Sequence, residues 1–234
     1  MRPMYQSKYK DLSKVYYLIG FTIFLSFFPS LISTTVSSLP IEFLILIPAL
    51  FGLSLLYSHR DDLREFVRYE VYTGFKLYIL SIVVTTVLAL VAAGFLISEI
   101  QADLISKVPM STSSIYFFDV FEVLIILVSN VIFYFSCKFF TTTAARKHIS
   151  NLNNFIILGI ALSVLGGIFI SIHLGNYATG YLNNNLFSNY DSTLFNNLYL
   201  MAIPITLIGR LLIFYGFFLV GRFVKYEPKY FLNA

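Results

Sequence analysis

The chain has few charged residues, one cysteine and no tryptophan. Only 12% of its 234 residues are charged, well below the share of about 25% in soluble domains, and 58% are hydrophobic, with a mean hydropathy of +0.79. This composition excludes an ordinary water-soluble domain. Because Cys137 has no second cysteine to pair with, an intrachain disulfide is excluded and a thiolate metal site is disfavoured.

The sequence also lacks the motifs of several enzyme classes. It contains no His-Glu-x-x-His, no Gly-x-Ser-x-Gly and no GxxxxGK[ST] phosphate-binding loop. The histidines His59, His148 and His173 all fall at or beyond the predicted membrane boundaries, so no pair is placed to hold a haem at mid-membrane. We therefore expect no catalytic residue, no metal and no cofactor in this chain.

Six apolar stretches of bilayer-crossing length occupy most of the chain. A transmembrane helix needs about 20 mainly apolar residues, and little sequence is left between these stretches for a soluble domain. The sequence therefore predicts an all-α integral membrane protein, with a single polytopic domain over residues 1–234 embedded in the lipid bilayer. The predicted spans cover roughly 15–36, 39–58, 75–97, 115–138, 155–174 and 198–221.

Positive charge is sorted between the two sides of these spans. Lys107 is the sole cation of the odd-numbered connections, and Arg210 lies inside the last span. Since Lys and Arg accumulate on the cytoplasmic side, the sorting predicts cytoplasmic termini in a multi-pass protein of the cell membrane. The net charge of +4 follows from this bias and does not indicate a nucleic-acid partner. The other cations fall in the N-terminal arm, the second and fourth connections and the tail: Arg2, Lys8, Lys10, Lys14, Arg60, Arg64, Arg68, Lys76, Lys138, Arg146, Lys147, Arg222, Lys225 and Lys229.

The connection from Ser58 to Gly74, SHRDDLREFVRYEVYTG, has the pattern of an amphipathic helix. Apolar residues fall on one helical face, and three arginines recur at four-residue spacing. Ser58 or Asp61 suits the start of such a helix and Gly74 suits its end. This pattern predicts a short charged helix on the cytoplasmic surface between the second and third spans. The pattern alone supports a solvated connector equally well.

The arm before the first span carries Tyr5, Tyr9, Leu12 and Tyr16 at helical spacing, with lysines around the other side. That pattern suits an amphipathic helix lying on the headgroups. A disordered basic arm that only sets the topology is nearly as well supported.

Three ionisable residues fall inside predicted spans. Arg210 costs about 2.5–3.5 kcal/mol at mid-membrane, so it is expected to face other helices or water. Asp119 and Glu122 share one face of the fourth span and are its candidate partners, across about 8 Å of depth that a long Arg side chain can cover. Two interpretations stay open: a polar site that gates or contacts cargo, and a structural arrangement in which Arg210 forms a packing ion pair or bonds backbone carbonyls.

The order of these parts resembles the membrane subunit of an ABC-2 type ABC exporter. Glu70 and Gly74, in EVYTG, match the spacing of the family's E-R-x-x-G style stretch, although Val71 stands where the family has Arg, with Arg68 nearby. The segment CKFFTTTAARKHISNLNN is similar to the family's Ser/Thr-rich helix end with its Ile-Ser-Asn type continuation. The tail GRFVKYEP is similar to the family's ending of basic residues followed by Glu.

The resemblance implies a permease subunit that has no nucleotide site of its own, pairs with a second membrane subunit as a homo- or heterodimer, and receives work from an ATP-binding cassette ATPase. The helix between the second and third spans would meet that ATPase. Two other hypotheses stay open: an accessory or assembly subunit of a larger membrane complex, and a small secondary transporter that uses the three intramembrane residues as a relay. The implied partner-binding residues are Asp62, Arg64, Glu65, Arg68, Glu70 and Gly74.

Overall fold

The computed structural model is all-helical in the part of the chain that it describes, which confirms the predicted fold class at that level. The described residues are 3–26, 39–58, 60–106, 112–147, 151–182, 192–227 and 230–231, and they contain no strand. The elements are α1 (Pro3–Leu25), α3 (Leu39–Ser58), the 3₁₀ turn η1 (Arg60–Asp62), α4 (Glu65–Ser106), α5 (Thr112–Lys147), α6 (Leu152–Leu182) and α7 (Ser192–Tyr226).

Four of these helices are long and apolar enough to cross a membrane. Their candidate spans are Glu65–Ala92, Val123–Thr142, Leu152–Ile170 and Leu200–Tyr226, while α1 and α3 contain the shorter apolar stretches Leu12–Leu25 and Ile47–Ser58. Many large apolar side chains along these helices point out of the bundle, which would be unfavourable in water and is favourable in lipid. Length, composition and exposed apolar surface together indicate a membrane protein.

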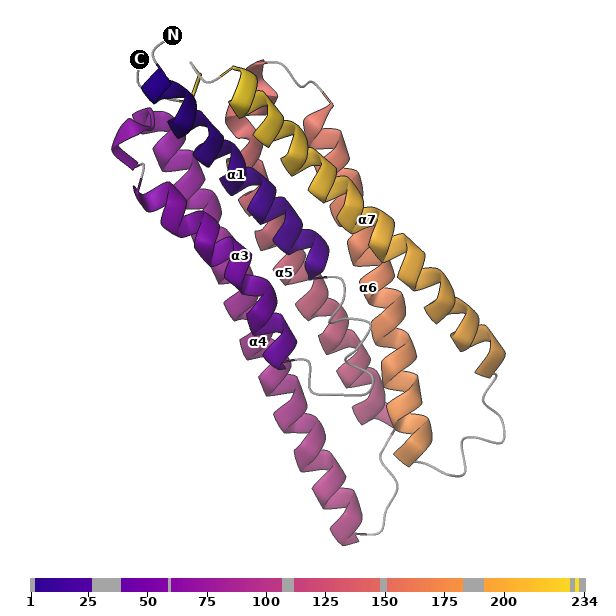
Figure 1. Cartoon of the computed structure of the whole chain (residues 1–234). Helices are drawn as coiled ribbons and strands as arrows, with labels where there is room; N and C mark the ends of the chain where they lie inside the picture. The colour runs from indigo at the N-terminus through magenta and orange to yellow at the C-terminus, as the bar shows by residue number, and fades with distance from the viewer. Residues whose placement is uncertain are drawn as a thin grey trace.

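Successive helices run in alternating directions through the bundle (Figure 1). α1 packs between α3 and α7, α4 packs on α5, α5 on α6, and α6 on α7. The start of α1, the turn η1, the end of α5, the start of α6 and the end of α7 all lie at one end of the molecule (Figure 1). We call this the η1 end. Most Lys and Arg residues of the described helices belong to segments that meet there.

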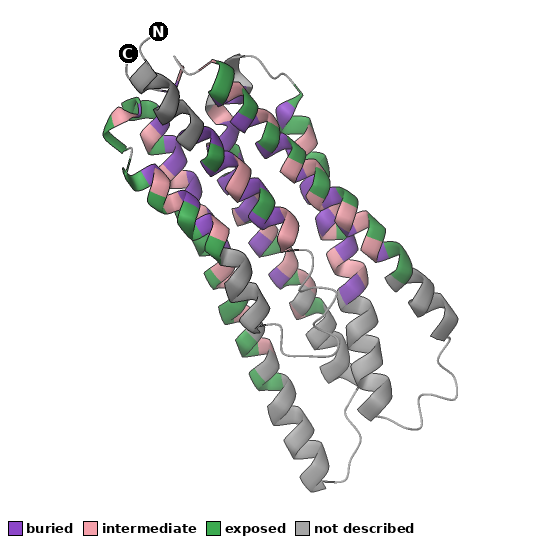
Figure 2. Ribbon diagram, viewed as in Figure 1, coloured by how far each residue is buried: buried purple, intermediate pink, exposed green. Residues whose placement is uncertain are grey.

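The described hydrophobic core lies in the half of the bundle toward the η1 end (Figure 2). Tyr16 of α1 and Phe217 of α7 are among its largest fully buried side chains. A run of edge-to-face aromatic contacts crosses this core. Phe217 meets Phe140 of α5 at 5.9 Å between ring centres, and Phe140 meets Phe75 of α4 at 5.7 Å. These rings join three helices at one level of the bundle.

The amphipathic segment before the third span is not a separate helix. It forms the first turns of α4, which runs without interruption for 42 residues and is therefore about 63 Å long, about twice the thickness of a hydrocarbon core. Gly74, expected to end a helix, lies inside α4 instead. A Cβ at Gly74 would lie 3.1 Å from Cγ and 3.2 Å from the backbone nitrogen of Phe140, so this glycine lets α4 and α5 approach closely.

Glycines let α6 and α7 approach closely. A Cβ at Gly209 would lie 2.6 Å from the carbonyl oxygen of Gly159, and one at Gly159 would lie 2.7 Å from the carbonyl oxygen of Gly209. Gly166 also faces α7, where its missing Cβ leaves room for Thr206. Small residues at membrane helix interfaces allow this kind of contact, in which van der Waals packing replaces the hydrophobic effect as the driving force. The same packing fixes the rotation of α7 about its own axis.

Candidate functional site

Arg210 lies next to Gly209 on α7 and is turned toward α5. Successive helical residues are about 100° apart, so packing Gly209 against α6 directs Arg210 toward a neighbouring helix. Its guanidinium carbon lies 5.9 Å from the centre of the Phe133 ring, and Tyr78 of α4 and Cys137 of α5 are within electrostatic range. Its Nε is buried and has no hydrogen-bond partner among the described residues.

Aromatic rings connect this arginine to the core of the η1 end. The Phe133 ring lies 6.2 Å from that of Tyr78, and Tyr78 lies 6.3 Å from Phe75, the first of the apolar residues of α4 that follow Gly74. A cation over an aromatic face contributes about 0.5–2 kcal/mol, which offsets part of the cost of placing Arg210 in the membrane. The site therefore spans α4, α5 and α7 and has a positive charge at its centre.

The predicted partners of Arg210 lie nearer the start of α5 than its observed contacts do. Asp119 and Glu122 are in the helix, but their side chains fall outside the part that the structure describes. Phe133 is eleven residues beyond Glu122, which is about 16 Å, or three turns, along the axis. The observed contacts of Arg210 are thus displaced toward the η1 end, and the pairing with either carboxylate stays a prediction.

Replacing Arg210 separates a structural from a functional role. Arg210→Met keeps a long apolar side chain against Phe133 and removes the desolvation cost of the charge, so we expect an unfolding temperature equal to or above that of the parent protein. Arg222→Met, at an exposed position on the same helix, is the matched control. A fall of about 5 °C in thermal unfolding, near 2 kcal/mol for a chain of this size, would show that Arg210 makes a stabilising ion pair. In the same assay, rescue of Arg210→Glu by Glu122→Arg would identify that partner.

The six residues implied to bind a partner divide between the surface and the interior of the η1 end. Arg64 and Glu65 are exposed, while Asp62 and Arg68 are half-buried. Glu70 is only 4% exposed and lies near Tyr16, on the face of α4 that packs into the bundle. The carbonyl oxygen of Gly74 accepts a hydrogen bond of 2.7 Å from the hydroxyl of Ser136. In this structure the Glu and Gly of the EVYTG stretch are packed into the bundle, and Gly74 also binds α4 to α5.

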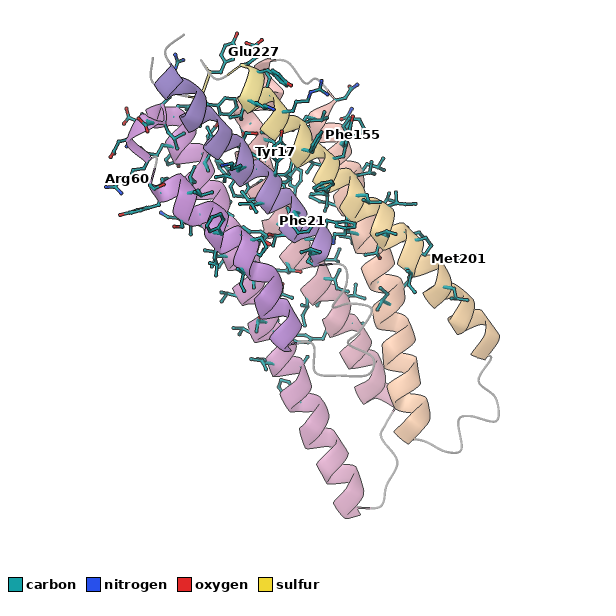
Figure 3. The ribbon with its side chains drawn as sticks, in the orientation of Figure 1. Tyr17, Phe21, Arg60, Phe155, Met201 and Glu227 are labelled. Carbon is teal, nitrogen blue, oxygen red and sulfur yellow. The ribbon has the colours of Figure 1, made fainter. Side chains whose placement is uncertain are left out.

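Exposed aromatic rings accompany the charges at the η1 end. Phe66 and Tyr69 of α4 and Tyr57 of α3 are all at least half exposed. The guanidinium of Arg60 lies 4.5 Å from the centre of the Tyr57 ring, and its Nε is 3.7 Å from a carboxylate oxygen of Asp61. Figure 3 shows Arg60 pointing away from the bundle at the turn between α3 and α4. These aromatic and charged side chains form a surface suited to a polar partner.

The last contact at this end, made by the C-terminal tail, was not predicted from the sequence. Phe231 is completely buried, and its carbonyl oxygen accepts a 3.0 Å hydrogen bond from the backbone N–H of Arg64. Its ring meets Tyr16 of α1 at 6.4 Å and Phe223 of α7 at 5.8 Å. Two adjacent aromatic residues in the tail, Tyr230 and Phe231, were the signal that this segment packs on the bundle.

Within the described residues, no group of three or more His, Cys, Asp or Glu side chains is placed to hold a metal ion. No protein-family model matches the chain, no curated protein matches its sequence significantly, and no solved structure matches its fold significantly. Two features of the structure indicate the function. One is the Arg210 cluster inside the bundle, which consists of Arg210, Phe133, Tyr78 and Cys137. The other is the charged surface at the η1 end.

Proposed function

We propose that the chain is the membrane subunit of an ATP-driven exporter of the ABC-2 type, and that it crosses the cell membrane six times with its η1 end in the cytoplasm. The chain lacks a phosphate-binding loop, so ATP hydrolysis belongs to a separate subunit. The proposed function therefore requires a surface on this chain to which the ATPase subunit can bind.

Six crossings are supported by the antiparallel order of the helices and by the distribution of charge. α1 and α3 run alongside the membrane-length helices, and α1 packs against both α3 and α7 (Figure 1). The cations Arg60, Arg64, Lys138 and Lys225 belong to η1, the start of α4, the second half of α5 and the end of α7, and the ends of these elements meet at the η1 end (Figure 1). Positive residues favour the cytoplasmic side, so this end is the one that an ATPase can reach.

The observation that carries the proposal is the construction of the first turns of α4. The helix starts at Glu65, whereas its strongly apolar sequence starts at Phe75, so about 15 Å of helix precedes the third span predicted from the sequence at 75–97. This extension buries Val67, Glu70 and Val71 against the bundle and exposes Glu65 and Tyr69 to a partner. We call its exposed residues the docking surface: Arg64, Glu65, Phe66 and Tyr69.

Continuity of α4 couples this docking surface to the interior. An uninterrupted helix moves as a unit, so a push on Glu65 or Tyr69 displaces Phe75 and Tyr78 within the membrane. Tyr78 contacts Phe133, which faces Arg210 of α7. Movement of the ATPase can therefore change the packing of α4 against α5 and α7. Two membrane subunits, identical or different, would then open a path between them by rigid-body rocking.

Co-purification with an ATPase tests this function. Reversing both charges of the exposed pair, with Arg64→Glu and Glu65→Lys together, is expected to lower the recovery of an ATPase subunit by about tenfold or more, equivalent to about 1.4 kcal/mol. Lys225→Glu is the matched control, because it reverses an exposed charge at the same end on α7. The proposal fails if no ATPase subunit co-purifies with the parent protein, or if the double variant recovers as much as the control.

A further inference from the structure

The residue at the start of α4 cannot cap the helix with its own side chain. The first hydrogen bond of the helix runs from the N–H of Arg68 to the carbonyl oxygen of Arg64, which makes Arg64 the N-cap residue. Arginine has no side-chain acceptor, so it cannot accept from the N–H groups of the first turn as Ser, Thr, Asp or Asn would at this position. The third helical residue is Val67, which is buried and cannot return a hydrogen bond to the N–H of Arg64 as a Glu or Gln would in a capping box.

A distant part of the chain supplies an acceptor for the N–H of Arg64. This N–H donates to the carbonyl oxygen of Phe231 at 3.0 Å. Helix geometry leaves the N–H groups at the start of a helix without intrahelical acceptors. The tail therefore gives the N–H of Arg64 the acceptor that a Glu or Gln at the third helical position gives in a capping box.

Packing on two further helices holds the tail in this position. The fully buried ring of Phe231 lies between Tyr16 of α1 and Phe223 of α7, in edge-to-face contact with both. The preceding ring, Tyr230, stacks on the Phe223 ring at 6.0 Å with an angle of 11° between their planes. Glu227, at the end of α7, accepts a hydrogen bond of 3.4 Å from the N–H of Tyr230, and Figure 3 places Glu227 at the η1 end.

We propose that Phe231 is a positioning residue for the docking surface, and that the C-terminal tail is a strap that joins the start of α4 to α1 and α7. The strap keeps the first turn of α4 helical under load, so that force from a partner moves the whole helix and does not unwind its end. The positioning role rests on the proposed function, because it concerns docking of the ATPase. The strap itself is a property of this chain alone.

Hydrogen exchange of the full chain, with and without the ATPase subunit, tests the proposal. In Phe231→Ala, the amides of Glu65 to Val71 are expected to exchange at least about tenfold faster, with the α6–α7 contact unchanged. Recovery of the ATPase subunit should fall in parallel, and Phe231→Leu, which keeps an apolar side chain in the site, should restore both. Tyr226→Ala removes an exposed aromatic ring at the same end and serves as the control.

The outcomes distinguish the strap from the docking function. Unchanged exchange at the start of α4 in Phe231→Ala overturns the strap, whatever the partner does. Faster exchange with undiminished ATPase recovery overturns the positioning role, whereas a parent protein that recovers no ATPase contradicts the proposed function. If Phe231→Ala does not fold, Tyr230→Ala decides the question, because it removes the stack on Phe223 and should speed exchange of the same amides by a smaller factor.

Discussion

Gly209→Leu is expected to prevent α6 and α7 from packing and to abolish recovery of the folded protein. Even the first carbon of a new side chain would lie 2.6 Å from the carbonyl oxygen of Gly159 and 2.8 Å from the backbone nitrogen of Ser163. Backbone atoms cannot rotate out of the way as a flexible side chain can, so the helices must separate. Overpacking a tight contact typically costs about 1–3 kcal/mol, and the larger Leu side chain in a backbone contact should exceed about 3 kcal/mol.

Gly94→Leu is the matched control for this substitution. Gly94 lies on α4, and a Cβ there would meet nothing within 4 Å. The same chemical change at Gly94 therefore adds apolar surface without a clash, and we expect at most a small shift in thermal unfolding. Size-exclusion profiles and unfolding temperatures in detergent compare the two variants. Equal behaviour of Gly209→Leu and Gly94→Leu would contradict the helix contact described for α6 and α7.

The consequence of losing this contact extends to Arg210. Packing of Gly209 on α6 sets the rotation that directs Arg210 toward Phe133. Gly209→Ala, a milder change, is therefore expected to disturb the Arg210 cluster even where the bundle still folds. The intramembrane site depends on a glycine that carries no chemistry of its own.

Hydropathy predicted the helical class, because apolar runs of this length have few other stable arrangements in a membrane. It could not predict the length of α4. Composition changes from charged to apolar near Gly74, but no proline interrupts the backbone there, and the tertiary contact with Phe140 uses this glycine for close packing. A change in composition marks where a helix enters a new environment, and not where its hydrogen bonds stop.

Periodicity also found the amphipathic start of α4 without showing what covers its inner face. Glu70 resembled a partner-binding residue by spacing, yet it is buried and lies near Tyr16 of α1, which is remote in sequence. The environment of Arg210 is a similar case. A search for opposite charges favoured Asp119 and Glu122, while the described contacts of the guanidinium are aromatic. Sequence patterns identify costly residues, but the neighbours that lower the cost come from the tertiary structure.

The proposed function requires the η1 end to lie on the cytoplasmic side of the membrane. If both termini and the docking surface face the cytoplasm, an ATPase can bind there, and if they do not, the proposed coupling cannot occur. A single introduced cysteine shows on which side of the membrane its position lies. Cys137→Ser first removes the one native thiol, which is fully buried, and replaces it with a side chain of similar size.

The most direct measurement of this orientation is therefore the labelling of single cysteines with a membrane-impermeant maleimide, in intact and in permeabilised cells. Glu65→Cys and Tyr226→Cys place thiols at exposed positions of the η1 end, and Ser192→Cys places one at the opposite end of α7. We expect Ser192→Cys to be labelled in intact cells, and the other two only after permeabilisation, an all-or-none difference. Labelling of Glu65→Cys or Tyr226→Cys in intact cells would contradict a cytoplasmic docking surface.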